Sequence, residues 1–232
     1  MKSSPKSQFR WDSFQAYLFD IDGTLLNSRD GVHYNAFHAA LESVFRVRDR
    51  IETVPVHGNT DPGILRAVTR KAEIPEETFV AGLPRALEHM RQSALQNCGE
   101  MRPEVCPGVR AVLDALRSRS KLLGLVSGNL EAIGWAKLRA AGLRDYFAFG
   151  SFSDQRESRR DIFAHGVAEA QRRLGSENAS VCIVGDTPSD IMAARECGLP
   201  VIAVATGPYA MDPLRAQSPD LCLSCCGDLL NN

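Results

Sequence analysis

The stretch that decides the fold reads Ala16-Tyr17-Leu18-Phe19-Asp20-Ile21-Asp22-Gly23-Thr24. Its first four residues are apolar without polar alternation, which is typical of a short strand covered on both faces of a parallel sheet. Two carboxylates follow at the carboxyl end of that strand, where α/β sheets bind their ligands. Because residues i and i+2 point the same way on an extended chain, we expect Asp20 and Asp22 to face one crevice. Gly23 then lets the backbone turn sharply.

Similar apolar runs farther along the chain predict the other strands of the same sheet. They are Leu122–Val126, Val181–Val184 and Val201–Val204, with a weaker one at Phe147–Phe149. Apolar residues at helical spacing lie between these runs, as in Val109-Arg110-Ala111-Val112-Leu113-Asp114-Ala115-Leu116. Alternating strands and helices predict an α/β fold, a Rossmann-like doubly wound parallel sheet with right-handed crossovers.

The segment between the first two predicted strands interrupts this alternation. It carries helical patterns at His33–Phe45, Pro62–Ala72 and Pro75–Gln96, and no convincing buried strand. We therefore expect an all-helical cap inserted after the first strand. The predicted division is an α/β core of residues 1–27 and 101–232 and a helical cap of residues 28–100, with Cys98–Pro103 as the return linker.

The composition excludes several classes of protein. The 232 residues contain 27 Lys and Arg against 28 Asp and Glu, so a strongly basic nucleic-acid binder is not expected. No apolar run reaches the roughly 18 residues of a membrane span, and Met1–Phe14 lacks the apolar region of a secretory signal. We expect a cytoplasmic protein with no nucleic-acid or membrane partner, either a monomer or a homodimer.

The cysteines do not predict a disulfide framework. There are seven of them, an odd number with irregular spacing. The tightest group, Cys222-Leu223-Ser224-Cys225-Cys226, has no second Cys/His pair at the spacing of a zinc site. It is better interpreted as a short apolar strand running into a turn with buried reduced thiols.

Two further strand ends carry polar groups. The stretch Val126-Ser127-Gly128-Asn129 offers a hydroxyl, flexible backbone and a helix start, which suits phosphate oxygens. The stretch Gly185-Asp186-Thr187-Pro188-Ser189-Asp190 places two more carboxylates after a predicted strand. Asp190 has an alternative interpretation, because at the third helical position a carboxylate serves the free amides of the helix N-terminus.

Together these groups favour phosphoryl chemistry. Clustered carboxylates repel one another unless a divalent cation neutralises them, and hard oxygen ligands suit Mg²⁺. A site with Mg²⁺, a hydroxyl and a fixed cation is suited to a phosphoryl group. The candidate cations are Arg159 and Arg160, before the helix that leads to the Val181 strand, and Lys137, on the helix after Ser127. Each is alternatively a solvated surface charge.

The order of these motifs resembles that of the haloacid dehalogenase superfamily of phosphohydrolases, over nearly the whole chain. Asp20–Thr24 is similar to its first motif, Ser127 to its second and Gly185–Asp190 to its fourth. The helical insertion is similar to the small cap of the phosphoglycolate-phosphatase-like branch. The third motif of the family is usually Lys, whereas here the matching region reads Glu157-Ser158-Arg159-Arg160-Asp161. We align Arg160 to the cation position, with Arg159 and Lys137 as alternatives.

The resemblance implies a Mg²⁺-dependent phosphatase that acts on a small phosphorylated metabolite such as phosphoglycolate. It implies that Asp20 is the nucleophile, which forms an aspartyl-phosphate, and that Asp22 is the general acid and base. The implied Mg²⁺ ligands are Asp20, Asp22 through its carbonyl, Asp186 and Asp190. The implied phosphate contacts are Ser127, the backbone at Gly128, and Arg160.

The sequence leaves two alternatives open. A phosphosugar mutase of the same superfamily would share the whole core and differ only in the cap, and a catalytically idle binding or regulatory protein would keep the fold. A dehalogenase is disfavoured because family members of that type lack the second carboxylate, here Asp22. Four polar cap residues either meet substrate or belong to the surface and helix caps: His33, His57, Thr60 and Asp61.

Overall fold

Six parallel strands form the main sheet of the computed structural model, which describes residues 9–231. The polar start of the chain, as far as residue 8, lies outside the described residues. The strands are β1 (Ala16–Phe19), β4 (Leu122–Val126), β5 (Phe149–Ser151), β6 (Val181–Gly185), β7 (Val201–Val204) and β8 (Leu221–Leu223), in the order β5-β4-β1-β6-β7-β8. This sheet confirms the predicted doubly wound α/β fold. The weak strand expected at 147–149 begins two residues later.

Strand β1 lies at the centre of the sheet, where the order of the strands reverses. The chain runs outward through β4 to β5 and then returns to β6, on the other side of β1. Phe19 of β1 is in register with Leu125 of β4 and Val184 of β6. All three strands therefore end at the same level, and that edge is the place where sheets of this kind bind ligands.

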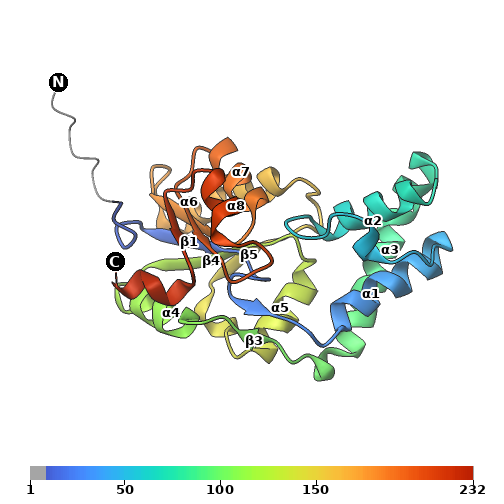
Figure 1. The fold of residues 1–232 in the computed structure, drawn as a ribbon, viewed down its shortest axis with the longest axis horizontal. Coiled ribbons are helices and arrows are strands. Elements are labelled where there is room, and N and C mark those ends of the chain that lie inside the picture. The colour runs from blue at the N-terminus through green and yellow to red at the C-terminus, as the bar shows by residue number, and fades with distance from the viewer. Residues whose placement is uncertain (1–8, 232) are drawn as a thin grey trace.

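Helices cover both faces of the sheet (Figure 1). Tyr17 and Phe19 pack on the side of α4 (Val109–Ser118) and α5 (Glu131–Ala140). Ala16 and Leu18 pack on the opposite side, with α6 (Arg159–Leu174), α7 (Pro188–Glu196) and α8 (Met211–Ala216). Both faces of β1 are thus buried, which explains its uninterrupted apolar sequence. Full burial of a large apolar side chain such as Phe19 contributes about 1.5–3 kcal/mol.

A separate group of helices lies beside the sheet, on the right in Figure 1. It consists of α1 (Val32–Ala40), α2 (Asp61–Lys71) and α3 (Glu76–Gln96), with a π-helical turn at Leu41–Phe45 and 3-10 turns at Ile51–Thr53 and Cys98–Glu100. Residues 28–100 are all described and contain no strand, as the sequence patterns predict. The chain enters and leaves this group through β2 (Leu26–Asn27) and β3 (Glu104–Val105), which pair antiparallel.

The helical insertion is packed directly onto the α/β part. Its apolar cluster, built from α1, α2 and α3, continues into Leu130 and into Ile133 and Ala136 of α5. Burial of these residues in one shared cluster couples the two parts energetically. The domain boundaries at residues 28 and 100 remain a prediction, because one apolar cluster extends from the insertion into α5.

The cysteines, all within the described residues, are free thiols. The short strand expected at the cysteine cluster is β8, which the 3-10 turn Cys226–Asn231 follows. Cys226 is buried as predicted, whereas Cys222 and Cys225 are half-buried. No described helix is both long and apolar enough to cross a membrane.

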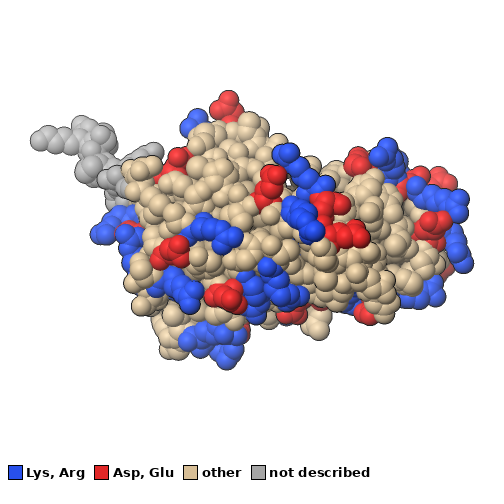
Figure 2. All heavy atoms as spheres, turned by 90° about the horizontal axis from the view of Figure 1, so that it is seen from below, with Lys and Arg blue, Asp and Glu red and all other residues tan. Residues whose placement is uncertain are grey.

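Charged side chains of both signs are interspersed on the face that Figure 2 shows. Proteins that bind the nucleic-acid backbone usually gather Lys and Arg on one face or along one helix. This face of the described residues does not carry such a one-sided basic surface.

Candidate active site

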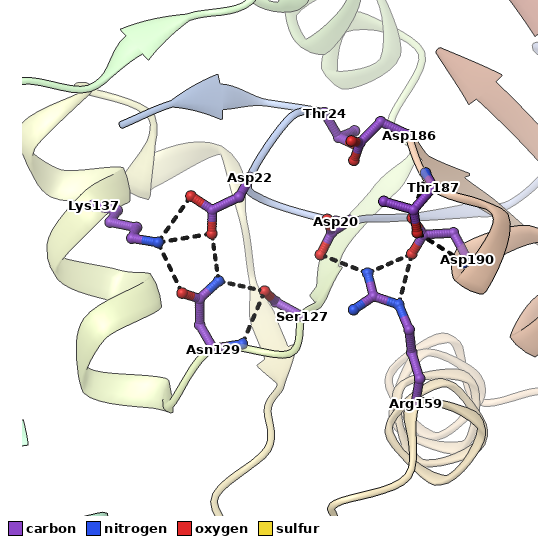
Figure 3. Close-up of polar contacts among 10 residues, drawn as sticks. All are labelled: Asp20, Asp22, Thr24, Ser127, Asn129, Lys137, Arg159, Asp186, Thr187 and Asp190. Atoms are coloured by element: carbon purple, nitrogen blue, oxygen red, sulfur yellow. Dashed lines mark hydrogen bonds and ion pairs between the residues drawn. The ribbon is translucent and has the colours of Figure 1, made fainter. Parts of the chain in front are cut away.

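Three buried carboxylates meet where β1 and β6 end (Figure 3). Asp20, Asp186 and Asp190 each place one oxygen within 4.8 Å of the others. The sequence separates the first of them from the other two by more than 160 residues, and the parallel register of β1 with β6 brings them together. The convergence expected from the strand ends is therefore present.

Asp186 carries a buried oxygen that lacks a partner. Its Oδ1 accepts a hydrogen bond from Thr24 Oγ1 at 2.8 Å, while its Oδ2 has no hydrogen-bond partner among the described residues. A Cβ atom built on Gly23 or Gly207 would lie only 2.2 Å or 1.8 Å from that oxygen. Glycine at both positions lets the backbone pack closely against this oxygen, and an unsatisfied carboxylate oxygen is costly to bury alone. Asp186 and Asp20 thus fit a hard divalent cation such as Mg²⁺.

Asp190 has both of its oxygens in use. Oδ2 accepts hydrogen bonds from the backbone N–H of Thr187 at 2.9 Å and from its hydroxyl at 2.7 Å, which forms a capping box at the start of α7. Oδ1 accepts a hydrogen bond from Arg159 Nε at 2.8 Å. The helix-capping interpretation of Asp190 therefore applies, and the same carboxylate also holds an arginine in the site. Its role as a metal ligand remains a prediction.

The cation beside the carboxylates is Arg159, and the alignment of Arg160 to this position is wrong. Arg159 Nη2 lies 3.1 Å from Asp20 Oδ1, and its side chain is only 9% exposed. Arg160 is exposed and does not line the cavity. The physical reason is helical geometry: α6 begins at Arg159, and successive residues of a helix point about 100° apart around its axis. Sequence alone does not fix which of two adjacent arginines faces the site.

Asp22 lies apart from the three clustered carboxylates, in a polar network of its own (Figure 3). Lys137 Nζ donates to both of its oxygens, at 2.7 and 2.8 Å, and Asn129 Nδ2 donates to one at 2.8 Å. Asn129 also donates to Ser127 Oγ at 2.8 Å and accepts from Lys137 at 2.9 Å. Lys137, one of the three candidate cations, is therefore the charged partner of Asp22. Sequence analysis missed Asn129, although its place two residues after Ser127 was a signal.

The two catalytic candidates have pKa shifts in opposite directions. Burial raises the pKa of Asp20 from 3.8 to about 7, with Asp190 adding to the rise and Arg159 opposing it. Burial and the charges of Asp190 and Asp20 also hold the pKa of Asp186 well above its usual range. Burial alone would raise the pKa of Asp22, but Lys137 and Asn129 reverse that effect and lower it. Nearby carboxyl groups with divergent pKa values are a feature of catalytic sites.

A cavity of about 560 Å³ opens over these groups, between the sheet edge and the helical insertion. Asp20, Asp22, Ser127, Gly128 and Asp186 line it from the sheet side. Most of the residues predicted from the strand ends thus share one cavity with Arg159 and Lys137. Asp190 does not line the cavity but contacts Arg159, which does.

The polar residues of the insertion have different positions. His33 lies between the two parts, with Nδ1 3.0 Å from Lys137 Nζ and Nε2 3.1 Å from Asp61 Oδ2. Asp61 also accepts a hydrogen bond from the backbone N–H of Leu130 at 2.8 Å. Thr60 is the N-cap of α2, which begins at Asp61, and His57 is exposed at the cavity. His33 and Asp61 therefore link the insertion to the lysine that holds Asp22.

The residue pattern of the haloacid dehalogenase-like hydrolases matches residues 17–204. The chain belongs to this family. The match covers β1 through β7 and confirms the resemblance drawn from the order of the motifs.

Relatives of this hydrolase of the haloacid dehalogenase-like family match over most of their length. This chain is 33% identical over 221 residues to the phosphoglycolate phosphatase of Synechococcus elongatus, and the match covers 93% of this chain and 95% of that protein. It is 29% identical over 206 residues to the phosphoglycolate phosphatase of Agrobacterium fabrum, covering 88% and 85%. The crystal structure of CbbY from Rhodobacter sphaeroides in complex with phosphate has a TM-score of 0.69 at 17% identity, covering 93% and 96%. At that identity the structural match shows the fold.

The hydrolase departs from the family pattern at the third motif, where the matching stretch begins with Glu157. The carboxylate of Glu157 accepts hydrogen bonds from Arg66 of α2 at 2.6 and 2.8 Å, and its backbone oxygen accepts from Thr60 at 2.8 Å. Glu157 therefore joins the insertion to the loop before α6. The positive charge next to Asp20 comes instead from Arg159, two residues later.

Proposed function

We propose that this protein is a Mg²⁺-dependent phosphatase that hydrolyses a small phosphomonoester through an aspartyl-phosphate. The observation that carries the proposal is the convergence of Asp20 and Asp186, with its unpartnered buried oxygen, next to Asp22 in one cavity. The relatives named phosphoglycolate phosphatases support the same class of reaction. The cytoplasmic location and a monomeric or homodimeric state remain predictions from the sequence.

The first half of the reaction is a nucleophilic displacement. A carboxylate oxygen of Asp20 attacks phosphorus, the bond from phosphorus to the ester oxygen breaks, and Asp22 gives its proton to the departing alcohol. Asp22 is ionised while Lys137 holds it, and the negative phosphate of an incoming substrate raises its affinity for a proton. In the second half, Asp22 takes a proton from the water that attacks phosphorus, the bond from phosphorus to the Asp20 oxygen breaks, and inorganic phosphate leaves.

The remaining residues hold the phosphoryl group and its charge. We propose that its oxygens are bound by Ser127, by the backbone N–H groups at Gly128 and by Arg159, which fills this role in place of Arg160. Bound Mg²⁺ would be held by Asp20 and Asp186, with the Asp22 carbonyl and Asp190 as the other predicted contributors. It would supply positive charge against the phosphoryl oxygens.

A phosphate-release panel tests the proposed function. The purified protein is incubated with phosphorylated metabolites, including phosphoglycolate and a hexose 1-phosphate, with MgCl₂ or with EDTA. Release of inorganic phosphate that requires the metal is expected. Conversion of the hexose 1-phosphate to an isomer without phosphate release, seen by ³¹P NMR, would replace the phosphatase by a mutase. No reaction with any ester would favour the catalytically idle alternative.

Magnesium is expected to stabilise the protein more at about pH 8 than at about pH 5. The raised pKa of Asp20 means that, without metal, the folded state keeps a proton that the unfolded chain has released. The stabilisation of the folded state by this retained proton is fully present below about pH 3.8 and is lost as the pH rises through about 7. Above that pH, a bound divalent cation is expected to replace the proton and restore the lost stability. The measurement is the rise in Tm on adding MgCl₂ to EDTA-treated protein. An equal rise at both pH values would contradict the metal assignment.

A further inference from the structure

The helical insertion gives the cavity an apolar wall, beside polar lining residues such as Arg29, Asp30 and Asn59. Five residues of the helical insertion form it: Tyr34, Phe37, Ile51, Val56 and Ile64. Phe37, Ile51 and Ile64 are buried, and the Phe37 ring stacks on His33 with the ring centres 5.0 Å apart. The part of a substrate that projects from the phosphate toward the insertion therefore meets aliphatic and aromatic surface.

The buried and half-buried basic side chains that line the cavity each contact a carboxylate. Lys137 contacts Asp22, Arg159 contacts Asp20 and Asp190, and His33 contacts Asp61. The other basic lining residues, Arg29 and His57, are exposed, so water competes with any anion that they would bind.

The charge balance of the lining also disfavours a second anionic group in the substrate. Five Asp side chains line the cavity against three Lys or Arg side chains. Among the described lining residues, no buried cation is left to pair with a second anionic group of a substrate. Burial of an unpaired carboxylate is strongly unfavourable.

The size of the cavity also exceeds what a very small substrate fills. Pockets of roughly 300–1,000 Å³ enclose drug-sized ligands, whereas phosphoglycolate has only about nine non-hydrogen atoms. At about 560 Å³ the cavity leaves room beside the apolar wall once a phosphoryl group stands at Asp20. Apolar substrate surface placed there is removed from water, which favours binding in proportion to its area.

Building on the proposed phosphatase function, we infer that the preferred substrate is the phosphate ester of a neutral alcohol with an apolar or aromatic group, and not a carboxylate-bearing ester such as phosphoglycolate. The phosphoryl group lies at Asp20, and the apolar group lies against Phe37, Ile51 and Ile64. Hydrolysis breaks the bond from phosphorus to the ester oxygen, and the neutral alcohol leaves with the proton from Asp22.

A matched set of esters tests this inference on the unmodified protein. Isobutyl phosphate has the shape of phosphoglycolate with two methyl groups in place of the carboxylate oxygens, and 2-phenylethyl phosphate reaches farther toward the apolar wall. With saturating MgCl₂, kcat/KM is expected to be about tenfold higher for isobutyl phosphate than for phosphoglycolate, and higher again for the phenylethyl ester. Equal or faster hydrolysis of phosphoglycolate overturns the inference and leaves the phosphatase function standing. If no ester is hydrolysed, both fall.

A pair of Val to Lys variants locates the effect. Val56 is half-buried and lines the cavity, whereas Val80 lies on α3, outside the lining, and is 55% exposed. Val56→Lys is expected to shift the ratio of kcat/KM toward phosphoglycolate by about tenfold, since it adds a cation to the wall. Val80→Lys is expected to leave the ratio unchanged. An unchanged ratio in Val56→Lys contradicts the inference. Should Val56→Lys fail to fold, Val56→Thr, nearly the same shape but polar, is expected to lower kcat/KM for 2-phenylethyl phosphate.

Discussion

Asp20→Asn is expected to abolish phosphate release while the protein stays folded. The amide has nearly the shape of the carboxylate but lacks the anionic oxygen that is proposed to attack phosphorus, and loss of a nucleophile lowers kcat by about 10⁴-fold or more. The buried Asp20 carries a raised pKa despite its contact with Arg159, so its charge costs folding free energy above about pH 7. In EDTA at such a pH, the variant is therefore expected to show a Tm no lower than that of the unmodified protein.

Two measurements check this prediction, namely steady-state phosphate release with MgCl₂ and thermal unfolding with and without the metal. Asp145→Asn is a matched control, because Asp145 is exposed in the turn before β5 and does not line the cavity. Its activity is expected to equal that of the unmodified protein. More than a few per cent of Mg²⁺-dependent activity in Asp20→Asn would exclude Asp20 as the nucleophile.

Arg159→Met is expected to lower both activity and stability, whereas Arg160→Met leaves both nearly unchanged. Removal of Arg159 leaves Asp20 and Asp190 buried without their counter-ion, and breaking a buried ion pair in this way typically costs about 3–5 kcal/mol. It also removes a fixed cation from the place where phosphoryl charge develops in the proposed reaction, for which a loss of about 10²–10³-fold in kcat is typical. Arg160 is exposed, so its replacement is expected to change stability by less than about 0.5 kcal/mol.

The two adjacent arginines make the comparison direct, since both substitutions remove the same charge from neighbouring positions of α6. The free energy of unfolding is measured with urea, in EDTA, and kcat is measured with MgCl₂ and an ester that the unmodified protein hydrolyses. A larger loss in Arg160→Met than in Arg159→Met would restore the original alignment of the third motif. Loss of stability without loss of kcat in Arg159→Met would make that arginine a purely structural counter-ion.

The network around Asp22 was only partly visible in the sequence. The hydroxyl of Ser127 directly after a predicted strand indicates a site residue, whereas the role of its partner Asn129 depends on contacts with Asp22 and Lys137. His33 and Asp61 were open alternatives between substrate contact and helix capping. They meet Lys137 and the Leu130 backbone because the helical insertion packs onto α5, an arrangement that no local pattern encodes.

The sequence by itself determined the central strands of the main sheet, the helical insertion and the strand ends where carboxylates gather, but it did not indicate the short pair β2 and β3. Apolar runs without alternation specify buried parallel strands, and parallel strands end at one edge, so Asp20 and Asp186 had to be neighbours once β1 paired with β6. Only the tertiary structure decided that Arg159 faces them rather than Arg160, and that apolar side chains of the insertion close the cavity. Those outcomes depend on the rotation of a helix about its axis and on packing between segments far apart in the chain, which local spacing does not fix.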